Sequence, residues 1–292
     1  MTKIKIFGIG GSGLIGSRVV ELLKDKYDID TISQQTGVDI TRIETLNNIT
    51  NDSSHQCVIL FAAKADVDGC EKDKPLGEQG DAYKINVLGV KNVIEACKKN
   101  NKKLIYISTD FVFDGENPSA GGYTEEDTPK PINWYGETKL KGEETVKNSG
   151  IPFLILRPAF PYRKEFAPKK DFVRAMLGRL QNNQPVVAIT DHIMTPTFID
   201  DIAFALDKLI ETNASGIYHI VGSQSLTPYD AALLIAKKFD CNTSLISKTT
   251  RAEFSKERAP RPFNLSMNND KIIKLGVTMR TFAEGLEVIS KS

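Results

Sequence analysis

Short apolar runs alternate with longer amphipathic stretches along the first half of the chain. Residues 58–61 read Val-Ile-Leu-Phe without a polar break, and an unbroken run of this kind is typical of a strand buried on both faces of a parallel sheet. Such runs predict strands at residues 4–9, 29–33, 57–62, 104–108 and 153–156. Apolar positions at helical spacing predict helices between them, at residues 14–24, 42–49, 81–98 and 135–147.

This alternation of strand and helix predicts an α/β protein with a doubly wound parallel sheet. After about residue 158 the pattern loosens, and residues 159–170 read as a loop. Helices are predicted at 172–180, 199–211, 228–239 and 281–289, with short strands near 186–187 and 217–220. We expect this half to add strands to the sheet and to form a smaller lobe over its carboxyl edge, where such folds bind ligands.

The composition is that of an ordinary globular protein. The chain has 292 residues, of which 40% are hydrophobic and 26% charged. The 38 Lys and Arg residues nearly match the 37 Asp and Glu residues, which argues against bulk electrostatic binding to nucleic acid or an anionic membrane. No apolar run is long enough to span a membrane, and the first predicted strand leaves no room for a signal peptide. We therefore expect a cytoplasmic protein.

Cysteine and histidine do not indicate a metal or hydrolase site. The four cysteines contain no C-x-x-C pair and the three histidines are widely separated, so we expect reduced thiols and no metal. We assign Cys70, His192 and His219 to structure. No G-x-S-x-G elbow is present, which disfavours a serine hydrolase.

A glycine-rich turn, Gly10-Gly11-Ser12-Gly13-Leu14-Ile15-Gly16, follows the first predicted strand and opens the first helix. A dinucleotide site requires this context, because glycines let the backbone approach a pyrophosphate and the start of the helix presents N–H groups to its charge. We take Gly10, Gly13 and Gly16 as the cradle; a turn without a ligand is the alternative. We thus expect a dinucleotide-binding Rossmann domain at residues 1–157 and about 186–222. The substrate-binding lobe is expected at about 158–185 and 223–292.

The residues that would select between NAD and NADP give a mixed signal. The second strand ends in Ser33-Gln34-Gln35, with neither the acid that favours NAD nor an arginine. Arg18 is a candidate for a 2′-phosphate, with a solvated helix face as the alternative. We favour NADP(H) over NAD(H). Asp39 and Ile40 are candidates to flank the adenine, although Asp39 is equally suited to cap the following helix.

Tyr135 and Lys139 form a Y-x-x-x-K pair, so they share one face of a predicted helix. A free phenol has a pKa of about 10, and a nearby lysine ammonium is expected to lower the pKa of Tyr135 toward working pH. Tyr135 would then donate a proton to a carbonyl oxygen, while Lys139 also holds a nicotinamide ribose. The alternative is chance, because this spacing is common on ordinary helices.

Two further polar residues are candidates for the same site. Thr109 ends the fourth predicted strand, where its hydroxyl would donate to a substrate carbonyl, although Ser108 competes for that role. Asn86 interrupts an apolar helical stretch. A buried asparagine needs hydrogen-bond partners, so Asn86 either braces Lys139 through water or backbone, or faces solvent.

Taken together, these residues resemble the extended short-chain dehydrogenase/reductases and, more narrowly, the dTDP-4-dehydrorhamnose reductase family. The resemblance covers nearly the whole chain. It is carried by 10–16, Ala62-Ala63, Val67-Asp68 with Glu71, 108–115, Tyr135-Gly136 with Lys139, Leu156-Arg157-Pro158, Thr195-Pro196-Thr197, 216–219, and Arg261-Pro262 with Asn264.

The resemblance implies Thr109, Tyr135 and Lys139 as a catalytic triad. It implies reduction of a 4-keto-6-deoxy sugar nucleotide with NADPH or NADH, so the expected partner is a nucleotide-sugar substrate. Further implied cofactor contacts are Leu14, Ile15, Ala62, Ala63, Lys64, Asn86 and Pro158, and implied substrate contacts are Val112, Phe113, Phe160 and Arg261. The oligomeric state stays open, with a homodimer as one expectation.

Two departures from the family pattern lie on the sugar side. Phe160 stands where the family usually has tryptophan, and Asp191-His192 stands where it usually has Asp-Gln. One alternative is therefore a non-catalytic NADP-binding subunit resembling the β regulatory subunit of methionine adenosyltransferase. A nucleotide-sugar epimerase is another. A 4,6-dehydratase is disfavoured, because Phe111 follows Thr109-Asp110 where dehydratases carry a glutamate.

Overall fold

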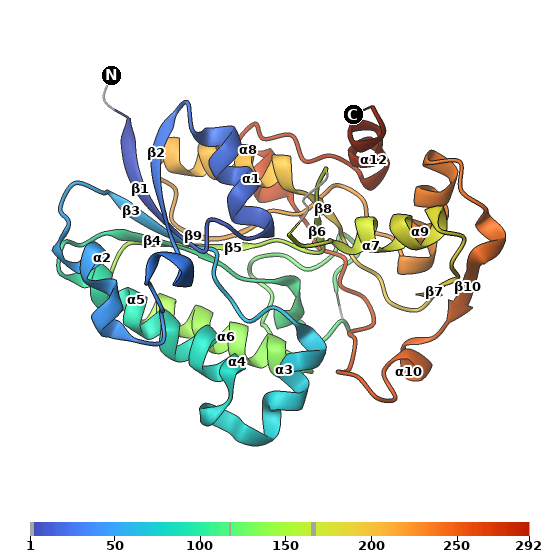
Figure 1. Ribbon diagram of the computed structural model, residues 1–292, viewed down its shortest axis with the longest axis horizontal. Helices are drawn as coiled ribbons and strands as arrows, with labels where there is room; N and C mark the ends of the chain where they lie inside the picture. Colours follow the sequence, from blue (N-terminus) through green and yellow to red (C-terminus); the bar gives the residue numbers. More distant parts are fainter. Residues whose placement is uncertain (1–2, 117, 165–167, 292) are drawn as a thin grey trace.

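The computed structural model describes residues 3–116, 118–164 and 168–291 (Figure 1). A six-stranded sheet with strand order β2-β1-β3-β4-β5-β9 forms its centre, and all its neighbouring strands are parallel. The strands are β1 (Ile4–Ile9), β2 (Tyr27–Ile32), β3 (Cys57–Leu60), β4 (Lys103–Ile107), β5 (Phe153–Arg157) and β9 (Gly216–His219). The predicted doubly wound α/β fold is confirmed. The strand order reverses at β1, and ligands of such sheets bind outside the carboxyl ends at this point.

Helices cover both faces of the sheet (Figure 1). One face carries α1 (Leu14–Leu23), α8 (Ile199–Glu211) and α11 (Asp270–Ile273), and the other carries α2 (Asn47–Asn51), α5 (Gly89–Lys98) and α6 (Trp134–Lys147). Strand side chains alternate between two separate cores: Ile6 packs in one and Phe7 in the other. Every residue of β3 is buried, as its unbroken apolar run predicts.

A smaller lobe lies beside the sheet (Figure 1). Its core is built on Tyr162, Phe198 and Phe282. Its elements are β6 (Pro161–Tyr162), α7 (Phe172–Gln181), β7 (Val186–Ile189), β8 (Thr197–Phe198), α9 (Pro228–Lys238), β10 (Ile246–Thr249), α10 (Arg251–Phe254) and α12 (Phe282–Ser290). Because β7 pairs with β10 and not with the main sheet, we propose a division in which residues 186–189 belong to the lobe.

Several elements differ from their predicted form. The helix predicted at 81–98 consists of α4 (Asp81–Tyr83), a π-helical turn (Lys84–Leu88) and α5. The helix predicted at 42–49 is a 3₁₀ turn (Ile43–Leu46) followed by α2. Helix α3 (Val67–Asp73) and strand β10 were not predicted. Strands β6 and β8 have two residues each, which is too short for an alternation of apolar and polar residues to be recognised in the sequence. Further 3₁₀ turns lie at Gln34–Thr36, Lys74–Gln79, Asp110–Val112 and Thr243–Leu245.

Within residues 3–116, 118–164 and 168–291, no helix is both long and apolar enough to cross a membrane.

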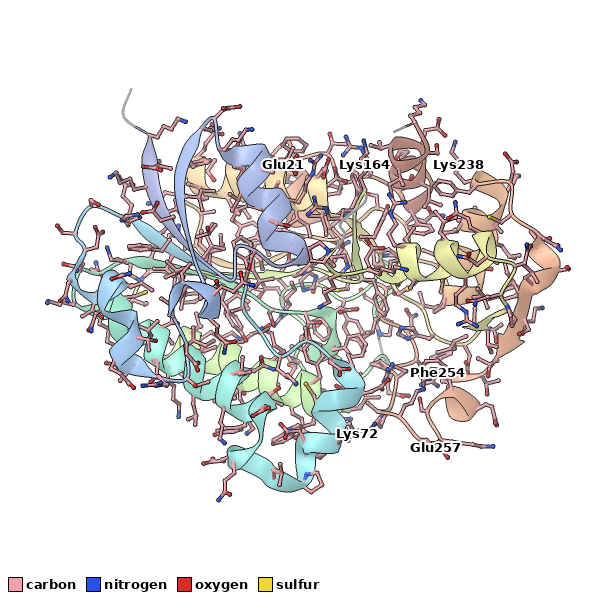
Figure 2. The ribbon with its side chains drawn as sticks, in the orientation of Figure 1. Glu21, Lys72, Lys164, Lys238, Phe254 and Glu257 are labelled. Carbon is pink, nitrogen blue, oxygen red and sulfur yellow. The ribbon has the colours of Figure 1, made fainter. Side chains whose placement is uncertain are left out.

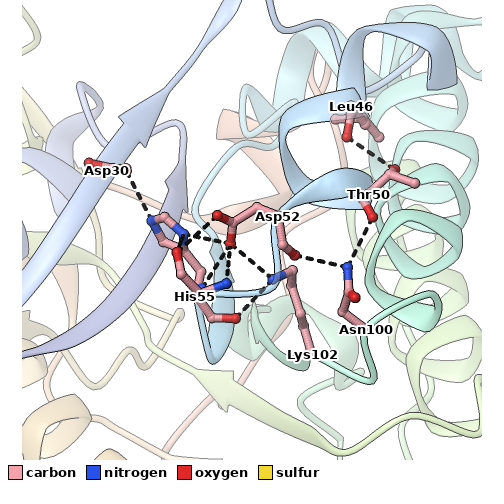
Figure 3. A network of polar contacts seen from close by, with 8 residues as sticks. Asp30, Leu46, Thr50, Asp52, His55, Asn100 and Lys102 are labelled. Carbon is pink, nitrogen blue, oxygen red and sulfur yellow. Dashed lines mark hydrogen bonds and ion pairs between the residues drawn. The ribbon is translucent and has the colours of Figure 1, made fainter.

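A polar network fixes the loop that leads into β3 (Figure 3). The Asp52 carboxylate accepts hydrogen bonds from the His55 backbone N–H at 2.8 Å and from Ser54, and it lies 3.4 Å from the Lys102 Nζ. Lys102, which is almost fully buried, also donates to the His55 carbonyl at 2.8 Å. The His55 ring stacks on Phe7 at 3.7 Å. These contacts join the chain before β3 to the chain before β4.

We predict that Asp52→Ala destabilises the protein by about 1 kcal/mol at pH 7, because it removes several hydrogen bonds at once. The hydrogen bond from the His55 backbone, together with His55 and Ser54 side chains, lowers the pKa of Asp52 from its ordinary value of 3.8. A lowered pKa means that the carboxylate stabilises the fold above about pH 4 and loses this effect as pH falls. Urea unfolding should therefore show a smaller difference between the two proteins at pH 3 than at pH 7. Asp25→Ala, at an exposed turn, is the matched control; equal losses in both variants would contradict the prediction.

Candidate active site

A cavity of about 480 Å³ lies at the carboxyl edge of the sheet, within the size range of small-molecule sites. The glycine turn lines this cavity, and Pro161 and Lys169 of the lobe line it as well. Its lining residues are Ile9, Gly10, Ser12, Gly13, Leu14, Ile15, Gly16, Ser33, Gln34, Gln35, Val38, Asp39, Ile40, Phe61, Ala62, Ala63, Ala65, Ile85, Pro161 and Lys169. Nine of the predicted cofactor-binding residues, from Gly10 to Ala63, are therefore brought together around one cavity.

The glycine turn needs its glycines for close packing. Gly10 has a φ of +78°, and a Cβ atom there would lie 2.8 Å from the Ala62 backbone nitrogen. A Cβ atom on Gly16 would lie 2.8 Å from the Gly10 carbonyl oxygen. Helix α1 starts after Gly13 with no side-chain cap and no acidic residue in its first turn. Its first N–H groups are therefore free to receive an anion, and the cradle fits the pyrophosphate of a dinucleotide.

Arg18 is not placed for a 2′-phosphate. Its guanidinium forms two hydrogen bonds of 2.7 Å with the Asp200 carboxylate on α8 and lies 2.9 Å from Glu21. The hydrogen bond with Asp200 raises the pKa of Arg18, and Arg18 does not line the cavity. These contacts give no support to the prediction that Arg18 binds a 2′-phosphate, and its partner Asp200, 182 positions away in the sequence, could not be foreseen from the local pattern.

Asp39 and Ile40 both line the cavity, as predicted for the adenine side. Asp39 also has a local structural role, because its Oδ1 accepts hydrogen bonds from the Thr41 backbone N–H at 2.9 Å and from the Thr41 hydroxyl at 2.8 Å. Asp39 thus stabilises the turn that contains Thr41. This role is similar to the helix capping that was the alternative prediction for Asp39.

Asn86 is buried and does not face solvent. Its side chain accepts a hydrogen bond from the Lys64 N–H at 2.9 Å, donates to the Lys64 carbonyl at 3.0 Å and donates to the Thr138 hydroxyl at 3.1 Å. It lies in the π-helical turn, a feature that is frequent at functional sites. Asn86 therefore joins the chain after β3 to α6 one residue before Lys139.

Thr109, Tyr135 and Lys139 meet beside the end of β4, each at most 8% exposed. Thr109 follows β4, and its side chain is hydrogen-bonded to Tyr135. Lys139 donates to the Ile107 carbonyl at 2.8 Å, and its Nζ lies 4.1 Å from the centre of the Tyr106 ring. The three side chains are therefore brought together by β4 and by one face of α6.

The pKa of Tyr135 is shifted in the opposite direction to the one predicted from its spacing to Lys139. Burial raises the pKa of Tyr135, and its hydrogen bond with the Thr109 hydroxyl opposes this only partly. Burial also lowers the pKa of Lys139 to about 7, with the Glu143 carboxylate acting in the opposite direction. The predicted lowering of the Tyr135 pKa is thus not found in the protein chain by itself, because desolvation dominates and the Thr109 hydroxyl is the group that opposes it.

Ser108 is committed to structure, so Thr109 is the hydroxyl left for a substrate. The Ser108 Oγ donates to Glu143 at 2.6 Å. Glu143 in turn forms a two-fold hydrogen-bonded pair with Arg157, at 2.9 and 2.7 Å, and both side chains are almost completely buried. Arg157 lies 3.4 Å from His219 Nε2, and burial lowers the pKa of His219 to about 3. His219 is a core residue, in line with its assignment.

The predicted substrate residues fall into two groups. Val112 and Phe113 have no exposed surface, and Phe113 stacks on Tyr123 at 4.2 Å, so their side chains belong to the core. Phe160 is only half-buried and has a φ of +40°, a strained value for an aromatic residue. Arg261 donates to the Asp68 carboxylate at 2.7 Å and so joins the lobe to α3.

Other predicted cofactor residues lie off the cavity lining. Lys64 is held through its backbone by Asn86, and Pro158 is buried directly after β5. Neither lines the cavity, so their predicted contacts remain predictions.

Asp110 was missed by the sequence analysis. It is 2% exposed, accepts a hydrogen bond from Thr109 at 2.9 Å, and its Oδ2 has no partner among the described residues. Burial raises its pKa to about 7. The available signal was an acid directly after the strand-end Thr109, at the edge where ligands bind.

The model of the RmlD substrate binding domain family matches residues 4–292. The chain belongs to this family. The dTDP-4-dehydrorhamnose reductase of Aggregatibacter actinomycetemcomitans is 31% identical over 93% of this chain and 92% of its own length. Methionine adenosyltransferase 2 subunit beta of Mus musculus is 29% identical over 86% of this chain and 74% of its own.

Solved structures give the same result. The dTDP-4-dehydrorhamnose reductase of Bacillus anthracis str. Ames, solved in complex with NADP, is 30% identical and superposes with a TM-score of 0.88 over 99% of each chain. The resemblance predicted from the motifs is therefore confirmed. Its relatives in this family include oxidoreductases that act on sugar nucleotides.

We predict that Arg157→Met destabilises this family member by about 3–5 kcal/mol, because it leaves the buried Glu143 carboxylate without its cation. The double variant Glu143→Met/Arg157→Met should lose less, since it removes both charges from the core. Urea unfolding of the wild type, both single variants and the double variant measures this coupling. Additive losses would mean that the two side chains do not act as a pair.

Proposed function

We propose that the protein is an NADPH-dependent reductase of the 4-keto group of a nucleotide-linked 6-deoxy sugar, of the kind that serves dTDP-rhamnose biosynthesis. The observation that carries this proposal is the meeting of Thr109, Tyr135 and Lys139 at the carboxyl end of β4. None of the three lines the glycine-lined cavity, which lies at the same edge of the parallel sheet. The full-length match to dTDP-4-dehydrorhamnose reductases supports it.

In the proposed reaction, a bound reduced nicotinamide supplies hydride to the carbonyl carbon. Tyr135 donates its proton to the carbonyl oxygen, and the Thr109 hydroxyl, already hydrogen-bonded to Tyr135, orients the same oxygen. Protonated Lys139 stabilises the phenolate that Tyr135 becomes, and it holds the ribose next to the nicotinamide. Both roles need a positive charge, which burial makes costly until an anionic ligand arrives.

NADPH is the proposed cofactor, although Arg18 does not contribute. The Bacillus anthracis relative was solved with NADP. In this chain Ser33, Gln34 and Gln35 line the cavity at the end of β2 and offer hydroxyl and amide donors without an acidic side chain. A carboxylate at this position would repel a 2′-phosphate, and none of these three residues is acidic.

The remaining proposals concern the partner, the location, the assembly and the two parts of the chain. We propose a nucleotide sugar as the small-molecule partner, a cytoplasmic location and a homodimer. We also propose a sheet domain that binds the cofactor and a lobe that binds the sugar.

A non-catalytic subunit is the second candidate, favoured by the similarity to methionine adenosyltransferase 2 subunit beta. The complete set of Thr109, Tyr135 and Lys139 in the buried arrangement described above argues for chemistry instead. The two functions differ in one observable: only the reductase consumes NADPH without a protein partner.

We predict that Tyr135→Phe lowers kcat for NADPH consumption with dTDP-4-keto-L-rhamnose by about 10²–10⁴-fold, because the proton donor is lost. Cofactor affinity, measured by fluorescence titration, should stay close to that of the wild type. Tyr106→Phe is the matched control, since it removes another buried phenol oxygen, 3.5 Å from the Lys139 carbonyl, without touching the Thr109–Tyr135 pair.

Three outcomes separate the candidates. Loss of turnover in Tyr135→Phe alone supports the reductase. Binding of NADPH without turnover of this substrate by any of the three proteins favours the subunit. Equal turnover in Tyr135→Phe and the wild type would remove Tyr135 from the chemistry.

We also predict that NADPH binding weakens by about threefold to tenfold as pH rises from 6.5 to 8.5. A shift of one unit in the pKa of a group on binding changes the affinity by about tenfold. Because the pKa of Lys139 is lowered to about 7, its ammonium is present below this pH and lost above it. Above pH 7, Lys139 must therefore take up a proton from the solution when the cofactor binds. Isothermal titration in buffers of different ionisation enthalpy should show proton uptake at pH 8 by the wild type.

Lys139→Met is the control, and it should bind more weakly with a flatter pH profile. The pKa of Asp110 is raised to about 7, so any slope that remains in Lys139→Met belongs to that carboxyl. An unchanged slope would show that Lys139 does not titrate on binding.

A further inference from the structure

The lobe contributes a cation to the cofactor cavity. Among the described residues that line the cavity, Lys169 is the one cation and Asp39 the one anion. Asp39 is already engaged by Thr41. Lys169 is exposed and forms no hydrogen bond or ion pair with any residue in the described ranges. A cation left free beside an anion cradle is therefore available to a ligand.

Contacts of its neighbours place Lys169 near the start of α1. The Arg163 guanidinium donates to the Ser17 hydroxyl at 2.9 Å and to the Leu14 carbonyl at 3.3 Å, which fixes the chain after β6 on the first turns of α1. The Arg163 backbone N–H donates to the Asp171 carboxylate at 3.1 Å. Asp171 follows Lys169 by two residues, so both ends of this stretch lie beside α1. The Arg163 guanidinium also lies 3.6 Å from the carboxylate of Glu21, which Figure 2 labels on α1.

This position favours one phosphate group over another. The pyrophosphate of a dinucleotide lies at the N-terminus of the first helix, whereas an adenosine 2′-phosphate lies at the end of the second strand. In this chain those places are the first turn of α1 and Ser33–Gln35. Pro161 and Lys169 line the cavity from the chain that Arg163 fixes to α1.

We propose that Lys169 forms an ion pair with the pyrophosphate of the bound dinucleotide, opposite the N–H groups of the glycine turn. The inference rests on the proposed dinucleotide binding and adds a binding residue from the lobe. It gives the lobe a direct part in holding the cofactor.

The test is cofactor affinity of Lys169→Gln, measured by fluorescence titration with NADPH and with NADH in the absence of a sugar. We expect both affinities to fall by about fivefold to tenfold and by the same factor, because both cofactors carry the pyrophosphate. The loss should shrink at high ionic strength, since the lysine is exposed. Lys169→Arg should retain most of the affinity.

Lys170→Gln is the matched control. Lys170 carries the same charge on the adjacent residue, but its Nζ lies beside Gly178 of α7 and it does not line the cavity. We expect it to bind both cofactors like the wild type.

Each outcome is decisive. An equal loss with both cofactors in Lys169→Gln alone supports the inference. A loss confined to NADPH would reassign Lys169 to the 2′-phosphate, and no loss, or the same loss in Lys170→Gln, would overturn the ion pair while the proposed reductase stands. Failure of the wild type to bind either cofactor would overturn the proposed function together with this inference.

Discussion

The buried ion pair between Glu143 and Arg157 fixes the geometry on which the candidate active site depends. Tyr135, Lys139 and Glu143 are spaced four residues apart, so they form one stripe of α6 that faces the sheet. Glu143 joins this stripe to β5 through Arg157 and to the end of β4 through Ser108. Lys139 adds a hydrogen bond to the Ile107 carbonyl of β4. The helix can hardly slide or rotate without leaving a charge unpaired in the core, and that is costly.

Close backbone packing reinforces this constraint. A Cβ atom on Gly142 would lie 2.7 Å from the Asn86 carbonyl oxygen, and one on Gly136 would collide with the Phe111 carbonyl oxygen. Helix α6 therefore touches the π-helical turn on one side and the chain after Thr109 on the other. Asn86 uses the same approach to reach Thr138. The sequence places glycines on α6 where its neighbours must come near, and the polar side chains then meet at hydrogen-bonding distance.

Features set by local sequence were predictable, whereas those set by distant partners were not. The strands of the main sheet, the glycine turn and the shared face of Tyr135 and Lys139 follow from periodicity and spacing. The ion pair of Arg18 with Asp200 joins two helices far apart in the sequence, so no local pattern announces it. The raised pKa of Tyr135 depends on how completely the fold excludes water. Pairing of β7 with β10 likewise depends on where the lobe chain returns.

The two residues expected to depart from the family pattern, Phe160 and His192, lie together in the structure. Phe160 packs against Phe111, Phe172 and His192, at ring distances of 6.0, 6.0 and 5.6 Å. His192 donates to the Pro262 carbonyl at 2.7 Å, while its Nε2 has no partner among the described residues. Neither residue takes part in the Glu143–Arg157 network or in the glycine turn. Substitutions at these two positions can therefore alter the lobe without disturbing α6, and under the proposed function they would change the surface offered to a sugar.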